Sequence, residues 1–271
     1  MGVWPFRYAP AWALAVGIGT GCRAVPASPP VPKPPVILWA WDRTEDLRFL
    51  ASQPALSVGV AYLHANVMLH GASVILHRRA ASLQLPEDLW QLPVVHIESD
   101  PALLPILQEG QRRELLRVVL AESARAGKGR LQIDFEAKPA QRAFYQKLLG
   151  ELRSELGPQF PLSVTALASW CYGDRWMSDF PVDEIVPMFY RLGAEGLRLR
   201  AALGRGADVA VECRRAHGLI TDEPMTLPPS PRRLYLFSPV PWTQAAFQSA
   251  TKKLSGGWGL TCRECGSYSH G

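Results

Sequence analysis

Short apolar runs alternate with amphipathic or loop segments from residue 36 onward. Runs of this length, rich in bulky side chains and bounded by Pro, Gly or polar turn formers, predict buried β-strands. The segments between them are expected to act as crossover connections, which favour parallel strand pairing. Eight strands are predicted, at residues 36–42, 57–69, 92–100, 129–136, 160–170, 182–193, 216–224 and 232–242.

Helices are predicted between several of these strands. One follows the third strand and ends at Gly127, because glycine is a common helix stop. A second begins near Pro139, which suits the first turn of a helix, and closes at Gly157. An amphipathic helix at 243–256 follows the eighth strand. The first helix is expected to bury one face made of Leu103, Leu107, Leu115, Val119 and Ala126.

Eight strands that alternate with crossover segments predict a single-domain (β/α)8 TIM barrel over residues 36–255. A doubly wound open sheet is the main rival among α/β folds. That rival usually has a glycine-rich phosphate loop after its first strand, whereas this chain continues with "WAWDRTEDL". The barrel is therefore the favoured fold, followed by a C-terminal tail at 256–271 that carries a CxxC pair.

The N-terminal 35 residues have the composition of an export signal and a linker. One positive charge precedes an 11-residue apolar segment, "AWALAVGIGTG", which fits a signal peptide at 1–21 and is too short to span a bilayer. Small residues precede Cys22, as in a bacterial lipobox, so lipidation of Cys22 is expected. The Pro-rich segment 22–35 would be an extended tether. We therefore expect a membrane-anchored lipoprotein on the periplasmic side of the cell envelope, or otherwise a secreted protein.

The remaining composition limits the choice of partners and cofactors. A net charge of +5 without any run of five or more basic residues gives little reason to expect nucleic acid. Cys262 and Cys265 form a lone "CREC", and a zinc site would need a second pair or suitably spaced histidines. A disulfide or two free thiols are the better interpretations. With Cys22 set aside, four cysteines remain, an even number that suits an oxidising compartment. No metal or other cofactor is expected.

Polar and aromatic side chains occur where the predicted strands end. In a TIM barrel these ends surround the active site, so we expect a functional mouth there. Asp134 and Glu136 share one face of the fourth strand, ~6–7 Å apart along it. Two carboxyls this close raise each other's proton affinity, so one can act as a general acid while the other stays ionised. The other strand-end residues are Asp42, His64 with Asn66 on one face, His96 with Glu98 on one face, Trp170, Tyr190, Asp222, Glu223 and Trp242.

The stretches "LQIDFEA" and "VDEIVPMFYRLG", together with Trp242 at the end of the last strand, resemble glycoside hydrolase family 18 and its chitinase-like relatives. The whole stretch from "VILWAW" to "VPW", with its lipoprotein-like start, more closely resembles a family of bacterial lipoproteins called domain of unknown function 3142. The first resemblance implies a TIM barrel, and the second implies no established reaction.

The family 18 resemblance implies roles for individual residues. Glu136 would be the general acid, and Asp134 its partner, which in chitinases orients the N-acetyl group that attacks the anomeric carbon. Met188 and Tyr190 would line the site, and Trp242 would form the floor of the sugar subsite. The chain departs from the family pattern at Gln132, which replaces the first Asp of Asp-x-Asp-x-Glu, and at Arg191, where an Asp is common.

These inferences predict an envelope-anchored barrel that hydrolyses a polysaccharide, with Glu136 and Asp134 as catalytic residues. Its expected substrate-binding residues are Tyr190, Trp242, Asp42, Asn66, Glu98, Met188 and Trp170. Because of Gln132 and Arg191, the alternative is a non-catalytic glycan-binding or scaffolding lipoprotein. A metal-dependent hydrolase using His64, His96 and nearby carboxylates is a third hypothesis, which lacks a metal-binding motif.

Overall fold

The computed structural model describes residues 34–53, 58–174, 176–193, 196, 198–199, 201, 210–223 and 233–258, all within the unit Lys33–Gly271. The expected signal peptide, Cys22, most of the tether and the Cys262–Cys265 pair lie outside these residues. None of the helices in the described part of the chain is long and apolar enough to cross a membrane.

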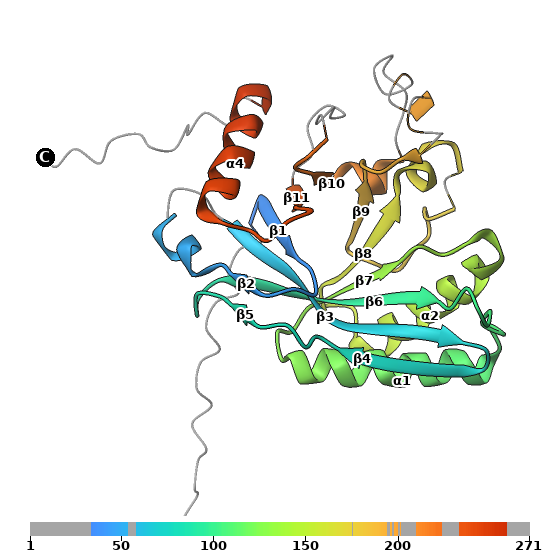
Figure 1. The fold of residues 1–271 in the computed structure, drawn as a ribbon. Coiled ribbons are helices and arrows are strands. Elements are labelled where there is room, and N and C mark those ends of the chain that lie inside the picture. The colour runs from blue at the N-terminus through green and yellow to red at the C-terminus, as the bar shows by residue number, and fades with distance from the viewer. Residues whose placement is uncertain are drawn as a thin grey trace, which may run out of the picture. The chain divides into compact units, whose positions relative to one another are not determined.

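Eight parallel strands form a closed barrel, as predicted (Figure 1). The barrel closes because β1 pairs in parallel with β11 on one edge and with β3 on the other. The (β/α)8 fold class is therefore confirmed, and every predicted strand is present, several of them shorter at their ends. The strands are β1 (Val36–Ala40), β3 (Val58–His70), β6 (Trp90–Ser99), β7 (Leu131–Phe135), β8 (Leu162–Leu167), β9 (Glu184–Met188), β10 (Ala216–Ile220) and β11 (Arg233–Phe237).

The barrel interior holds an apolar layer and a polar layer. The apolar layer includes Trp39, Trp90 and Tyr235. Gly59 makes room for the Trp90 ring, because a Cβ on Gly59 would lie 2.7 Å from Trp90 Cε3. The polar layer joins β7, β8, β9 and β11 through side-chain hydrogen bonds among Gln132, Ser163, Glu184, Tyr235 and Arg233. Inward-pointing side chains thus fill the barrel, as the period-two pattern of its strands requires.

Helices cover the outside of the barrel. The predicted helices correspond to α1 (Glu109–Ala126), α2 (Arg142–Leu156) and α4 (Gln244–Trp258). The helices α1 and α2 pack on the β6–β8 side, and α4 packs against β1 and β11 (Figure 1). The first helix begins later than its pattern indicated, so Leu103 and Leu107 lie in the loop before it. Leu107 has a left-handed backbone (φ 55°), which no helix interior accommodates.

The β3–β4 hairpin is an extension that the apolar pattern did not predict. The strand β4 (Ser73–Arg78) pairs antiparallel with the second half of β3, beyond the part that pairs with β1. A bulge at His64 shifts the register of β3 against β6. The predicted shared face of His64 and Asn66 is therefore wrong. His64 Nε2 lies 3.2 Å from a Glu122 oxygen on α1, whereas Asn66 donates to Glu98 on β6.

The remaining elements are short. The strands β2 (Glu45–Asp46) and β5 (Leu83–Gln84) form a two-stranded sheet of their own. The turns η1 (Arg48–Ser52), η2 (Pro139–Gln141) and η5 (Val211–Arg214) are 3-10 helical, and η3 (Trp170–Asp174) is a π-helical turn. A disulfide between Cys171 and Cys213 joins η3 to η5. It therefore links the segment after β8 to the segment before β10.

Candidate active site

The carboxyl ends of β7 and its neighbours bring the predicted acid pair to the barrel mouth. Asp134 lies within β7, and Glu136 follows directly after that strand. The Asp134 side chain is buried. Its Oδ1 accepts a 2.5 Å hydrogen bond from the Thr165 hydroxyl on β8, and its Oδ2 lies 3.0 Å from His96 Nδ1 on β6. Two neighbouring strands thus hold the Asp134 carboxyl in place.

The pKa of the His96 imidazole depends on its contact with Asp134. Burial, the largest single influence, lowers its pKa. The hydrogen bond and charge of Asp134, with smaller contributions from Glu98 and Glu136, outweigh burial, so the pKa of His96 is raised overall. His96 is therefore a cationic partner of Asp134 over a wider pH range than a free histidine.

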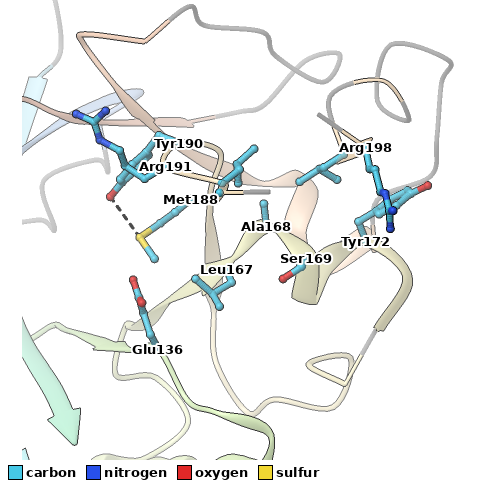
Figure 2. A pocket seen from close by; sticks show the side chains of 12 residues that line it. Glu136, Leu167, Ala168, Ser169, Tyr172, Met188, Tyr190, Arg191 and Arg198 are labelled. Atoms are coloured by element: carbon cyan, nitrogen blue, oxygen red, sulfur yellow. Dashed lines mark hydrogen bonds between the residues drawn. The ribbon is translucent and has the colours of Figure 1, made fainter. Parts of the chain in front are cut away.

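Glu136 lines a cavity of about 660 Å³ at the mouth (Figure 2). Its side chain is solvent-exposed, so it is accessible to a bound molecule. Desolvation by the surrounding protein, followed by the charge of Asp134, raises the pKa of the Glu136 carboxyl against a smaller lowering by His96. A carboxyl with a raised pKa retains its proton closer to neutral pH, which is the property a general acid requires.

The end of β9 supplies the next wall of this cavity. Met188 and Tyr190 both line it, and the Tyr190 hydroxyl donates to the Met188 sulfur at 3.3 Å (Figure 2). Burial and the nearby charges of Asp134 and Glu136 raise the pKa of the Tyr190 phenol, so it remains a neutral hydrogen-bond donor. The structure therefore brings Glu136, Met188 and Tyr190 together, with Asp134 behind them.

The opposite end of the cavity combines apolar and polar side chains. Ala168, Leu192 and Leu199 contribute apolar surface. Tyr172 and Arg198 also line the cavity, on the side away from Glu136 in Figure 2. Ser169 adds a hydroxyl to the lining. A cavity of this size and mixed lining suits a small ligand or part of a polymer.

Arg191 lies next to Tyr190 and is held by two carboxylates that follow β10. Its guanidinium donates to Asp222 at 2.6 Å and lies 3.2 Å from Glu223, whose carboxylate also accepts from the Arg191 backbone N–H. These contacts hold Arg191 in a left-handed backbone conformation (φ 51°) that non-glycine residues rarely adopt. The positive charge of Arg191 is therefore compensated within the protein.

Gln132 belongs to the polar layer beneath Asp134. Its Nε2 donates to the Ser163 hydroxyl at 3.0 Å, and Ser163 in turn lies 3.4 Å from a Glu184 oxygen. Its Oε1 is buried without a hydrogen-bond partner among the described residues. An amide here adds no charge beneath the acid pair, whereas an aspartate would place a third carboxylate there.

Five further predicted site residues lie away from the cavity lining. Trp242 is 2% exposed, and its indole donates to the Trp39 carbonyl at 2.9 Å, so its ring presents no open face to a sugar. Trp170 is likewise buried, packed against Trp176. Asp42 is exposed near the backbone N–H of Ala81. Asn66 and Glu98 bond to each other on the β3–β6 extension at 2.9 Å.

Two aromatic residues of the mouth were not predicted as site residues. Trp41 contacts the His96 ring edge-on at 5.3 Å between ring centroids. Phe237, at the end of β11, stacks on Tyr190 at 5.9 Å and lies 6.3 Å from Trp41. Alternation along the first strand could have indicated Trp41, because it follows the inward-facing Trp39 by two residues.

The structure gives no support to a metal centre built from the predicted histidines. His64 pairs with Glu122, and His96 pairs with Asp134. Across the described part of the chain, no group of three or more His, Cys, Asp or Glu side chains is placed to hold a metal ion.

Comparison with solved structures identifies similar folds. The putative chitinase A from Streptomyces coelicolor superposes with a TM-score of 0.55 at 11% identity, covering 82% of this chain and 97% of that one. The spore cortex-lytic enzyme SleL of Bacillus cereus gives a TM-score of 0.45 at 14% identity, covering 74% and 55%. Comparison with protein-family models gives no match. No curated protein sequence matches either. The chain therefore has a chitinase-like TIM-barrel fold.

Proposed function

We propose that this protein is a glycoside hydrolase in which Glu136 is the general acid. The observation that supports this most directly is the position of Glu136. It lines an open cavity of about 660 Å³ at the barrel mouth, and its pKa is raised by desolvation and by Asp134. Hydrolysis of a glycosidic bond needs an acid that protonates the leaving oxygen, and a protonated Glu136 meets this need. The chitinase-like fold agrees with this chemistry but does not by itself imply it.

In the proposed mechanism the other residues stabilise the transition state. The sugar acquires positive charge as the bond breaks, and the Asp134 carboxylate beside it lowers the energy of that charge. Thr165 occupies one lone pair of Asp134 Oδ1, and His96 occupies one of Oδ2. Each of these oxygens has a second lone pair that can accept another hydrogen bond. Asp134 can therefore also accept a bond from an N-acetyl N–H, as the resemblance to chitinases implies. Tyr190 donates its hydroxyl within the same cavity.

The test is the conservative Glu136→Gln variant, which keeps the shape and removes the acidic proton. We expect release of reducing sugar to be abolished while glycan binding remains. Glu114→Gln, an exposed carboxylate on α1 paired with Arg117, is the matched control and should retain activity. Failure of the wild-type protein to release sugar from a broad glycan panel, including amino-sugar polymers, would reject the enzymatic proposal.

Gln132 favours a second candidate, a glycan-binding or scaffolding protein without turnover. Its neutral amide is bonded to Ser163, so the chain lacks the third carboxylate of the family 18 motif at this place. If this candidate is right, wild-type protein binds glycans and releases no sugar. Because Trp242 is buried, the diagnostic variant is Tyr190→Ala, which should weaken glycan binding.

We further propose that the protein is a lipoprotein of the cell envelope, related to domain of unknown function 3142, with Cys22 lipidated. The small residues before Cys22 and the Pro-rich tether suggest this location. The Cys171–Cys213 disulfide supports an oxidising compartment, because disulfides are rare in the reducing cytosol. A Cys22→Ala variant should move from the membrane fraction to the soluble fraction and lose labelling by a fatty-acid probe. If the Cys22→Ala variant stayed in the membrane fraction and kept the fatty-acid label, lipidation at Cys22 would be contradicted.

A further inference from the structure

The charged side chains of the cavity differ in how they are held. Three charged side chains line it: Glu136, Arg191 and Arg198. Arg191 is compensated by Asp222 and Glu223. Arg198 is exposed, so its guanidinium is accessible to a molecule in the cavity. The cavity therefore offers a bound ligand an accessible guanidinium, that of Arg198, in addition to the Glu136 carboxyl.

Arg198 occupies a defined part of the cavity. It lines the same cavity as Tyr172, and both residues appear on the side away from Glu136 in Figure 2. The segment that carries it packs closely on the turn after β9, because a Cβ on Gly196 would lie 2.7 Å from Leu192 Cβ. Tyr172 directly follows Cys171, which is fixed by the disulfide to Cys213. The close packing of Gly196 and the disulfide thus each constrain a residue next to, or two positions from, this part of the lining.

The chemistry of this end of the cavity points to a carboxylate. A guanidinium presents a planar fork of N–H donors that matches a carboxylate in geometry and charge. Ser169 and Tyr172 add hydroxyls that suit sugar oxygens, and Leu192 and Leu199 supply apolar surface for the faces of a sugar ring. A neutral polymer such as chitin would leave the Arg198 charge unused.

We propose that the substrate is an acidic glycan, and that Arg198 binds the carboxylate of a sugar that neighbours the bond cleaved beside Glu136. The claim that the acidic glycan is a substrate rests on the proposed hydrolase function. The claim that Arg198 binds its carboxylate can be tested without turnover. Two substrate types share this chemistry. One is a polymer of uronic acids, in which the carboxylate is part of the sugar. The other is a peptidoglycan strand, in which a lactyl ether of muramic acid carries it.

The experiment measures binding by calorimetry in the Glu136→Gln background, so that no ligand is consumed. The probes are uronate oligosaccharides, peptide-free peptidoglycan strands, the carboxyl-reduced form of each, and neutral chito-oligosaccharides. We expect one of the two acidic ligands to bind at least about 10-fold more tightly than its reduced form, since a charge-assisted hydrogen bond is lost on reduction. The ligand that shows the preference identifies the source of the carboxylate.

Arg198 variants then assign the effect to this residue. Arg198→Gln should weaken binding of the preferred acidic ligand by about the same factor and leave its reduced form unaffected, whereas Arg198→Lys should recover part of the loss. Arg117→Gln, an exposed arginine on α1, is the matched control and should change nothing. Thermal melting checks that each variant is folded.

Two results would overturn the inference: equal or tighter binding of the neutral ligands, or unchanged acidic binding in Arg198→Gln. Neither depends on turnover by the wild-type protein. Acidic binding that depends on Arg198 without any sugar release by the wild type would leave the inference standing and reject the hydrolase proposal.

Discussion

At the scale of single residues, the site depends on contacts between side chains that are far apart in the sequence. Asp134 was identifiable from its spacing to Glu136, but its bonds to His96 and Thr165 come from neighbouring strands. These bonds hold the Asp134 carboxyl in place. Protonated His96 lowers the pKa of Glu136, while desolvation and Asp134 raise it. The pKa of Glu136 therefore reflects a balance among desolvation, the charge of Asp134 and the charge of His96.

This balance predicts a change in the pH dependence of activity. Ionisation of the general acid sets the fall of kcat/KM at high pH. His96→Gln removes a positive charge that favours ionised Glu136, so the pKa of Glu136 rises further and the fall in kcat/KM moves to higher pH. His77→Gln, an exposed histidine on β4, should leave the profile unchanged. A shift to lower pH in His96→Gln would contradict the assignment.

The same contact predicts how stability varies with pH. The folded protein raises the pKa of His96, so its protonated form is stabilised by folding. This contribution is complete below the ordinary histidine pKa and is lost as pH rises through the raised value. The difference in unfolding free energy between wild type and His96→Gln should therefore be largest at low pH within the folded range. Urea denaturation across pH measures it, and a difference that grows with pH would be incompatible with this sign.

At the scale of elements, the barrel strands depend on close complementarity between small and large inward residues. The strand β3 carries Gly59 opposite the Trp90 ring of β6. Gly59→Val places methyl groups where Trp90 and Pro34 already lie, and overpacking of this kind costs about 1–3 kcal/mol. Gly150→Ala on α2 is the contrasting control, because a Cβ added at Gly150 would have no neighbouring atom within 4 Å. It should stabilise by about 0.5–1 kcal/mol through helix propensity. The melting temperatures of both variants test this. Equal melting temperatures for Gly59→Val and Gly150→Ala would contradict the close packing at Gly59.

At the scale of the whole molecule, closure of the barrel brings together a charged pair from two strands that are not adjacent in the sheet. Glu184 on β9 pairs with Arg233 on β11, with side-chain exposures of 3% and 17%, and Tyr235 donates to Glu184 at 2.6 Å. Arg233→Met leaves a buried carboxylate without this partner, which costs about 3–5 kcal/mol. Adding Glu184→Gln to that variant should recover much of the loss. Chemical denaturation of the wild type and both variants measures their free energies of unfolding. If the Glu184–Arg233 pair were solvated, adding Glu184→Gln to Arg233→Met would recover no stability.

The sequence by itself determined the fold class and the location of the acid pair. Eight apolar runs of strand length specify eight buried strands, because hydrophobic burial follows the local pattern of side chains. A shared strand face likewise brings Asp134 and Glu136 together. Only the tertiary structure decided the neighbours of these residues. The bulge in β3 turned His64 toward α1, packing buried Trp242, and the ends of β9 and β10 paired Arg191 with two carboxylates. Such contacts depend on the register between strands and on how helices pack against them. Both bring together residues that are far apart in the sequence, so a local pattern does not predict them.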